Sequence, residues 1–315
     1  MNIMSLHELK TATVLDITLK LKNDNVSVLK SLGANHLRLQ MALVGLICKF
    51  FIWIVFLKKT IKKRQILARR VIKFFFPARI TSDPYSAIKL FSSPGQPVVA
   101  YFNHQSLFEV FAIIGLAFDC PSKSCLFPVN LPWFEALSPV SDKLRDLGIV
   151  ITPMITPKTQ KKILSLSPQN QSVVDSLKRT FESEYFSLIK VFATVGDIIA
   201  VAPSATRTPS IFPNRQAYHH EDLAALKTMP RTISAIMLAL KRHNRPSNEI
   251  RFIPISITPK NQKLPFAGVN LFRKHNIAIG KPLNFQQMHN LQKQRIVDFV
   301  ACRKLADLSP TIFRY

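Results

Sequence analysis

Residues 97–109 read PVVAYFNHQSLFE, and this stretch decides the fold predicted for the chain around it. Its apolar, β-rich beginning is typical of a strand, and a second apolar run over 110–118 is typical of a helix. Ser106 and Glu109 form an S-x-x-E capping-box pattern, which predicts that the helix begins at Ser106. The turn can then fold His104 back against Glu109, so His104 is a candidate general base and Glu109 the carboxylate that stabilises its imidazolium.

The alternative for this stretch is a plain helix cap beside a histidine in a turn. Short motifs match by chance often enough that these residues alone do not choose between the two interpretations. The remainder of the chain has to decide.

The composition favours a folded, basic protein that meets an anionic membrane surface. The 315 residues are 47% hydrophobic, which excludes general disorder, and they carry a formal net charge of +25. Apolar character combined with strong positive charge favours lipid over nucleic acid, and no motif that reads a nucleic-acid groove is present. The four cysteines form neither a metal pattern nor a disulfide framework, which fits a reducing, cytoplasm-facing compartment.

The glycines exclude several classes of enzyme. The chain has only eight, and no two lie within ten residues of each other. This spacing removes the dinucleotide-binding G-x-G-x-x-G, the phosphate-binding G-x-x-x-x-G-K loop and the G-x-S-x-G nucleophile elbow.

The N-terminal quarter predicts a membrane anchor. No role is assigned to residues 1–35. Within 36–76, the apolar run Met41–Leu57 is interrupted by Lys49 and is followed by Lys58–Lys73, where eight of sixteen residues are basic and none is acidic. This pattern predicts either a short span or a helix pair in the interface, with the basic flank in the cytoplasm. The alternative is a buried core helix followed by a solvated basic face.

Residues 77–315 predict an α/β domain with a central, mostly mixed sheet flanked by helices, because short apolar runs alternate with longer helical ones. A proline inside one apolar strand, Pro254, predicts an edge strand or a bulge. The expected strands are Val98–Phe102, Ser124–Pro128, Leu147–Thr152, Ile198–Ala202, Arg251–Ile257 and Asn276–Gly280, and the expected helices are Ser106–Phe118, Gln171–Thr194, Glu221–Arg242 and Phe285–Leu305.

A second candidate site follows the strand Ile198–Ala202. Ser204, Thr206 and Arg207 lie in the turn after it, and a guanidinium matches the oxygens of a phosphate bidentately. The alternative is a surface loop whose arginine is solvated.

The order of these blocks resembles the glycerolipid acyltransferase superfamily, which includes the lysophosphatidic acid and glycerol-3-phosphate acyltransferases. The family's N-H-x4-D, F-P-E-G-T-R, V-P-V and G-x-P blocks are similar, in that order, to stretches between residues 90 and 285. These stretches are Asn103-His104…Glu109, Ala202-Pro203-Ser204-Ala205-Thr206-Arg207, Ile253-Pro254-Ile255 and Gly280-Lys281-Pro282.

The resemblance implies that His104 acts as general base and Glu109 orients it, while Arg207, with Ser204 and Thr206, holds the phosphate of the acceptor. The donor would be acyl-CoA or acyl-carrier protein. The acceptor would be a lysophospholipid, with lysophosphatidic acid first, or glycerol-3-phosphate. No metal and no other cofactor is implied.

Three departures separate this chain from the family pattern. Glu109 stands in place of Asp, and Ser204-Ala205 replace Glu-Gly. The arginine that the family carries four positions after the glycine of its second block is missing after Gly148, and Arg145 or Lys158 are the candidate substitutes. A catalytically weak lipid-binding relative therefore remains an alternative to the enzyme.

Two further clusters of residues are not predicted to form a functional site. His219-His220-Glu221-Asp222 contains metal-ligand types, but adjacent residues seldom converge on one ion, and the two acids favour the start of a helix instead. Trp133-Phe134 predicts an amphipathic turn on lipid or along an acyl tunnel, with core packing as the commoner alternative.

Overall fold

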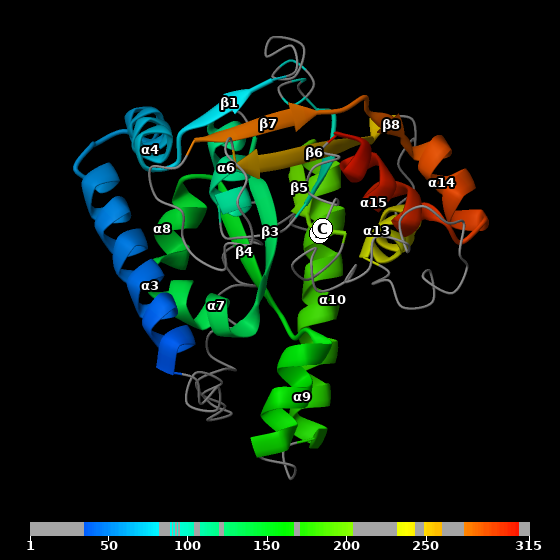
Figure 1. The fold of residues 1–315 in the computed structure, drawn as a ribbon, viewed down its shortest axis with the longest axis horizontal. Helices are drawn as coiled ribbons and strands as arrows, with labels where there is room; N and C mark the ends of the chain where they lie inside the picture. The colour runs from blue at the N-terminus through cyan, green and yellow to red at the C-terminus, as the bar shows by residue number, and fades with distance from the viewer. Residues whose placement is uncertain are drawn as a thin grey trace, which may run out of the picture. The chain divides into compact units, whose positions relative to one another are not determined.

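The computed structural model describes residues 35–81, 95–103, 108–119, 123–166, 171–203, 232–242, 249–259 and 274–308, with single positions 89, 91 and 93. Figure 1 shows the helices and strands along the chain. Two compact units are distinguished: residues 1–64 with 126–191, and residues 65–125 with 192–315. Each unit mixes helices with strands.

The first unit is built around the long helix α3 and the strand pair β3 and β4. α3 packs against α7 and the adjoining turn of 3-10 helix η1, and Gly45 lets the backbone oxygen of Ala136 approach. β3 and β4 are hydrogen-bonded neighbours. The elements are α3 (Asn35–Phe56), β3 (Cys125–Asn130), α7 (Leu131–Leu137), η1 (Ser138–Val140), α8 (Ser141–Asp146), β4 (Ile149–Met154), α9 (Pro157–Leu166) and most of α10 (Gln171–Val195).

The second unit is built on a mixed sheet with the strand order β1-β7-β6-β2-β5, in which β8 pairs with β6. β2 is parallel to both β5 and β6, whereas β7 and β8 are antiparallel to β6. The elements are most of α4 (Ile61–Phe75), β1 (Ala78–Ile80), β2 (Val98–Phe102), α6 (Phe108–Phe118), β5 (Ile198–Val201), α13 (Thr232–Lys241), β6 (Arg251–Pro259), β7 (His275–Ile279), β8 (Leu283–Asn284), α14 (Phe285–Lys293) and α15 (Val297–Leu308).

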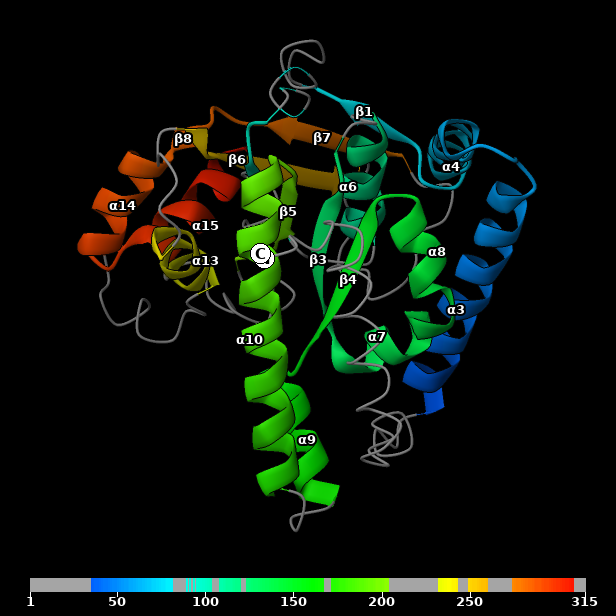
Figure 2. The ribbon, with the colours of Figure 1, turned by 180° about the vertical axis from the view of Figure 1, so that it is seen from behind.

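The core of the second unit lies around the three parallel strands. Every residue of β2 and β5 is buried, as is 252–257 of β6. Such strands read as continuous apolar runs because both faces are covered. α15 packs against β6 and α13 packs against α15, and Figure 2 shows these helices with α14 beside β6 and β8.

The six expected strands are all found, with ends that differ by up to two residues. The expected helices are confirmed for α6 and α10, and the described part of 221–242 is helical as α13. The short strands β1 and β8 and the helix α9 were not anticipated. Phe134 on α7 is fully buried, and Trp133 is half-buried. Core packing is therefore confirmed for Phe134.

Of the two alternatives predicted at Pro254, the edge is wrong, because β6 has β2 on one side and β7 and β8 on the other. The bulge is confirmed: Ile255 pairs with Ile279 and Phe252 with Leu283, so two residues of β6, Ile253 and Pro254, face the three residues 280–282. Pro254 has no backbone N–H to donate to a neighbouring strand, but its carbonyl still accepts from the backbone N–H of Gly280 at 2.9 Å. A Cβ at Gly280 would lie only 2.8 Å from Cγ of Pro254 and 3.0 Å from Cδ1 of Leu308. The interior proline is therefore accommodated by the missing side chain of Gly280.

The single helix expected over Phe285–Leu305 is also corrected, since α14 and α15 are separate. Arg295 lies between them with φ of 59°, a left-handed conformation that ends a helix. The N–H of Arg295 donates to the carbonyl of Gln292, and the N–H of Ile296 to that of Leu291, which satisfies the helix end. No glycine or proline marks this break in the sequence, so periodicity alone carried the prediction across it.

Among the residues that the structure describes, no helix has the length and apolar character needed to cross a bilayer.

Gly280→Ala should destabilise the protein by about 1–3 kcal/mol, because the added methyl overlaps a proline ring that cannot move out of a paired strand. Urea unfolding followed by circular dichroism measures the change. The matched control is Gly115→Ala, where the new Cβ meets Ile72 at an ordinary 3.4 Å. Equal stability of both variants would show that the Pro254 contact is not restrictive.

Candidate functional site

Two of the sequence blocks leave the sheet of the second unit side by side. β2 and β5 are parallel and in register from Val98 with Ile198 to Tyr101 with Val201. Carboxyl ends of parallel strands lie at the same edge, so Asn103 and Ala202 emerge there on neighbouring strands. Ligand sites of open α/β sheets form at this edge. Segments about one hundred residues apart are thereby brought to one place.

Asn103 ties the end of β2 to the neighbouring strand β6. Its side-chain amide donates from Nδ2 to the carbonyl of Ile257 at 2.8 Å, and its Oδ1 accepts from the N–H of Ile257 at 2.7 Å. Asn103 is 2% exposed, so both contacts are shielded from water. The side chain thus pairs with β6 as a backbone would, and it fixes where the chain leaves β2.

Glu109 lies in the first turn of α6 and is 2% exposed. The amino end of a helix carries partial positive charge, which stabilises a carboxylate at that position. A buried carboxylate that starts the helix after β2 fits a group that orients a neighbouring imidazole.

The remaining predicted site residues lie outside the described residues. His104 and Ser106 follow Asn103 directly, and Ser204, Thr206 and Arg207 follow Pro203. The structure describes the flanks of both segments, namely β2 with α6, and β5. The contact of His104 with Glu109 and the role of Arg207 therefore stay predictions.

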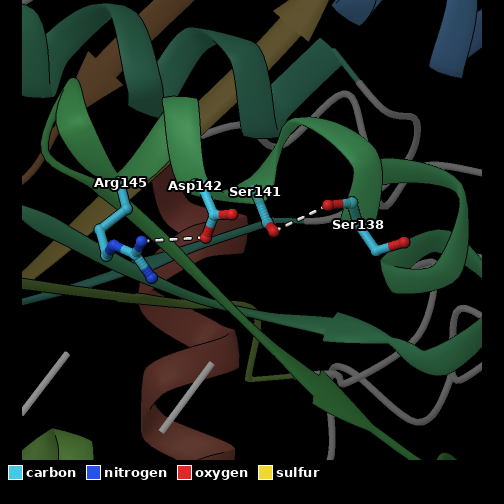
Figure 3. A network of polar contacts seen from close by, with 4 residues as sticks. All are labelled: Ser138, Ser141, Asp142 and Arg145. Atoms are coloured by element: carbon cyan, nitrogen blue, oxygen red, sulfur yellow. Dashed lines mark hydrogen bonds and ion pairs between the residues drawn. The ribbon is translucent and has the colours of Figure 1, made fainter. Parts of the chain in front are cut away.

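Arg145 is one of the two candidate substitutes for the arginine that is missing after Gly148. It lies on α8 before β4, whereas the fourth position after Gly148 is the fully buried Thr152. Figure 3 shows Arg145 Nη2 donating to Oδ1 of Asp142 at 2.9 Å, next to a bond of 2.8 Å from Oγ of Ser141 to the carbonyl of Ser138. Lys158, the other candidate substitute, is on α9, and its side chain is outside the described set.

Metal ligands are not grouped in the described part of the chain, where no three His, Cys, Asp or Glu side chains converge. The run from His219 to Asp222 lies outside it. Burial raises the pKa of the Cys48 and Cys302 thiols to about 12, and for Cys302 the carboxylate of Asp298 acts in the same direction. These two thiols are therefore poor nucleophiles and poor metal ligands at neutral pH.

Sequence reasoning missed Asn103 as a positioning residue, although it stands at the end of a predicted strand. The available signal was an amide side chain after five apolar residues, where a polar group needs a partner if it is buried. The identity of that partner, 154 residues away, could not be read from the sequence.

No family model and no curated protein matches this chain. Among solved structures, its fold is similar to the crystal structure of the 1-acyl-sn-glycerophosphate (LPA) acyltransferase, PlsC, from Thermotoga maritima. The two share 16% sequence identity with a TM-score of 0.39, over 84% of this chain and 88% of that chain. A likeness at this level assigns neither an activity nor site residues to the present chain.

Asn103→Asp should destabilise the protein by about 2–4 kcal/mol, because it removes the donor to Ile257 and buries a charge in its place. Chemical unfolding measures the loss. The control is Asn284→Asp, at the exposed N-cap of α14, where Asp caps as well as Asn and no change is expected. A stable Asn103→Asp protein would mean that the pairing with β6 does not fix the end of β2.

Proposed function

We propose that this protein is an O-acyltransferase that moves a fatty acyl group from acyl-CoA or acyl-carrier protein to a hydroxyl of a phosphorylated glycerol acceptor. Lysophosphatidic acid is the first candidate acceptor, and glycerol-3-phosphate or another lysophospholipid the next. The observation that carries the proposal is the emergence of the Asn103 and Ala202 blocks at one edge of neighbouring parallel strands. A candidate base, His104, and a candidate phosphate-binding arginine, Arg207, both predicted from sequence, come two and six residues after the ends of these strands.

The proposed reaction needs one base and one attacking oxygen. His104 takes the proton of the acceptor hydroxyl, and the oxygen attacks the thioester carbon. The carbon–sulfur bond then breaks, and the proton on His104 leaves with the thiolate. Glu109 stabilises the imidazolium in between, a role that its burial strengthens because water does not screen the charge.

Arg207 is proposed to hold the acceptor phosphate, with Ser204 and Thr206 beside it. A guanidinium keeps its charge at every working pH and binds two oxygens at once. Support comes from the position of β5, which delivers this block next to the one that contains His104. The replacement of Glu-Gly by Ser204-Ala205 is the feature that would favour a weak or silent relative instead.

An anionic membrane, at its cytoplasmic face, is the proposed location. α3 has two apolar faces: Cys48, Ile52 and Val55 are buried in the first unit, while a second stripe is exposed. The exposed stripe consists of Leu46 at 65%, Phe50 at 52% and Trp53 at 61% of their free area, and of Leu57 at 63% directly after the last residue of α3.

These spacings, of four, three and four residues, place the exposed stripe on one side of the helix. The exposed Lys58, Lys59, Lys62 and Lys63 follow it in the chain. An apolar stripe continued by basic residues fits a helix that lies in the interface of an anionic leaflet, with its other face kept on the protein.

The catalytic test is acyl transfer by purified protein with acyl-CoA or acyl-carrier protein as donor and lysophosphatidic acid or glycerol-3-phosphate as acceptor. His104→Ala should lower kcat by 10² to 10⁴, the usual cost of losing a general base. Glu109→Gln should also be severe, because it keeps the shape and removes the charge, whereas Glu109→Asp should retain activity.

Near-normal turnover of His104→Ala would rule out this mechanism. No turnover by the wild-type protein with any acceptor, together with saturable binding of lysophospholipid, would establish the silent lipid-binding relative. Arg207→Lys separates recognition from chemistry, since it should raise KM for the phosphorylated acceptor more than KM for the donor.

The membrane test is flotation with vesicles that contain anionic phospholipid. The double variant Phe50→Ser/Trp53→Ser should bind at least tenfold more weakly, because it removes two large side chains from the exposed stripe. High salt should release little of the wild-type protein, since apolar insertion is not screened. Leu238→Ser on α13, which is 52% exposed, is the matched control and should bind normally.

A further inference from the structure

The helix that carries Glu109 is held along one side by α4, within the second unit. Three contacts repeat at about one-turn intervals in antiparallel sense. The rings of Phe76 and Phe111 stack with centroids 4.3 Å apart and planes inclined by 8°. Ile72 lies over Gly115, and a Cβ added at Gly115 would be 3.4 Å from Cγ2 of Ile72. At the far end Arg69 and Lys73 reach Asp119, and both Figure 1 and Figure 2 show the two helices side by side.

Asp119 is an unfavourable residue for α6 considered by itself. Its backbone N–H closes the helix by donating to the carbonyls of Gly115 and Leu116. A carboxylate at the carboxyl end of a helix opposes the helix dipole, and the side chain of Asp119 is only 6% exposed. Burial raises the pKa of its carboxyl, and Lys73 and Arg69 act in the opposite direction.

Among the described residues, the charges that compensate Asp119 come from α4. Nε of Arg69 forms an ion pair with Oδ1 of Asp119, and Nζ of Lys73 lies 3.8 Å from the same oxygen. A buried carboxylate without such partners would be costly, so the pair holds only while α6 stays in place on α4. The charged contact therefore fixes α6 at the end opposite to Glu109.

The direction in which α6 leaves this anchored end sets the place of its first turn. α6 has 11 residues and is about 16 Å long, so a tilt of about 5° about its carboxyl end moves the first turn by about 1.4 Å. Misplacement of a catalytic group by about 1 Å can cost up to a hundredfold in rate.

We propose that Asp119 is a positioning residue for the acyl transfer, which acts through the α4 contact to set the place of Glu109. This inference rests on the proposed function, and it adds to it a residue ten positions beyond Glu109 at the other end of the same helix. The alternative is a purely structural ion pair that stabilises the unit without directing Glu109.

A double-mutant cycle in kcat separates the two roles. Asp119→Asn keeps the shape of the side chain and removes its charge. In the wild-type background it should lower kcat about tenfold, with KM for acyl-CoA and for lysophosphatidic acid changed less than twofold. In the Glu109→Gln background the same substitution should change the residual kcat less than twofold, because the group that it positions has lost its charge. An equal loss in both backgrounds would overturn the proposal.

Hydrogen exchange of the peptide that covers residues 108–112 gives a readout that does not need turnover. Exchange should be faster in Asp119→Asn than in the wild-type protein, since one of the three contacts that hold α6 is lost. The control is Asp142→Asn, which removes a different Asp–Arg pair whose carboxylate is 70% exposed and which should change neither exchange nor kcat.

Turnover and hydrogen exchange together distinguish a failure of the proposed function from a failure of the positioning role. A wild-type protein without acyl transfer contradicts the proposed function, and the exchange result alone then decides whether Asp119 holds the start of α6. An active wild type with unchanged exchange in Asp119→Asn contradicts the positioning role and leaves the proposed function intact.

Discussion

The pairing of the Asn103 side chain with both backbone groups of Ile257 is the constraint on which the candidate site depends. Backbone groups inside a sheet must be paired, and here an amide side chain does the work of a strand at the point where β2 stops. The chain is therefore released from the sheet at one defined residue. Everything proposed for His104 follows from that release point, because it is the next residue.

The site edge combines two kinds of support. The strands β6, β2 and β5 are parallel and buried, and they form a rigid base whose carboxyl ends lie together. The helix α6 is held from the outside by α4 through a ring stack, a close approach and an ion pair. A site that rests on such elements is more precisely placed than one on loops alone.

Much of the fold was predictable, because the relevant signals are local. The apolar runs at Val98–Phe102 and Arg251–Ile257 gave their strands, and the run after Glu109 gave α6. The failures came where local signals were misleading. Pro254 indicated an edge or a bulge; β6 is not an edge strand, and Pro254 lies at a bulge where Gly280 makes room for it inside the sheet. Arg295 ends α14 in a left-handed conformation that no sequence rule assigns to arginine.

The sequence by itself determined which residues are chemically able to act: a histidine and a carboxylate five positions apart, and an arginine in a turn after a strand. It also set the apolar character of α3, whereas the docking of α3 decided which of its apolar residues are buried and which stay exposed. Only the tertiary structure decided that the strands before these two blocks are parallel neighbours, that Asn103 is tied to Ile257, and that Asp119 meets Arg69. Strand order and helix docking depend on burying the whole apolar surface at once, and no local pattern contains that information.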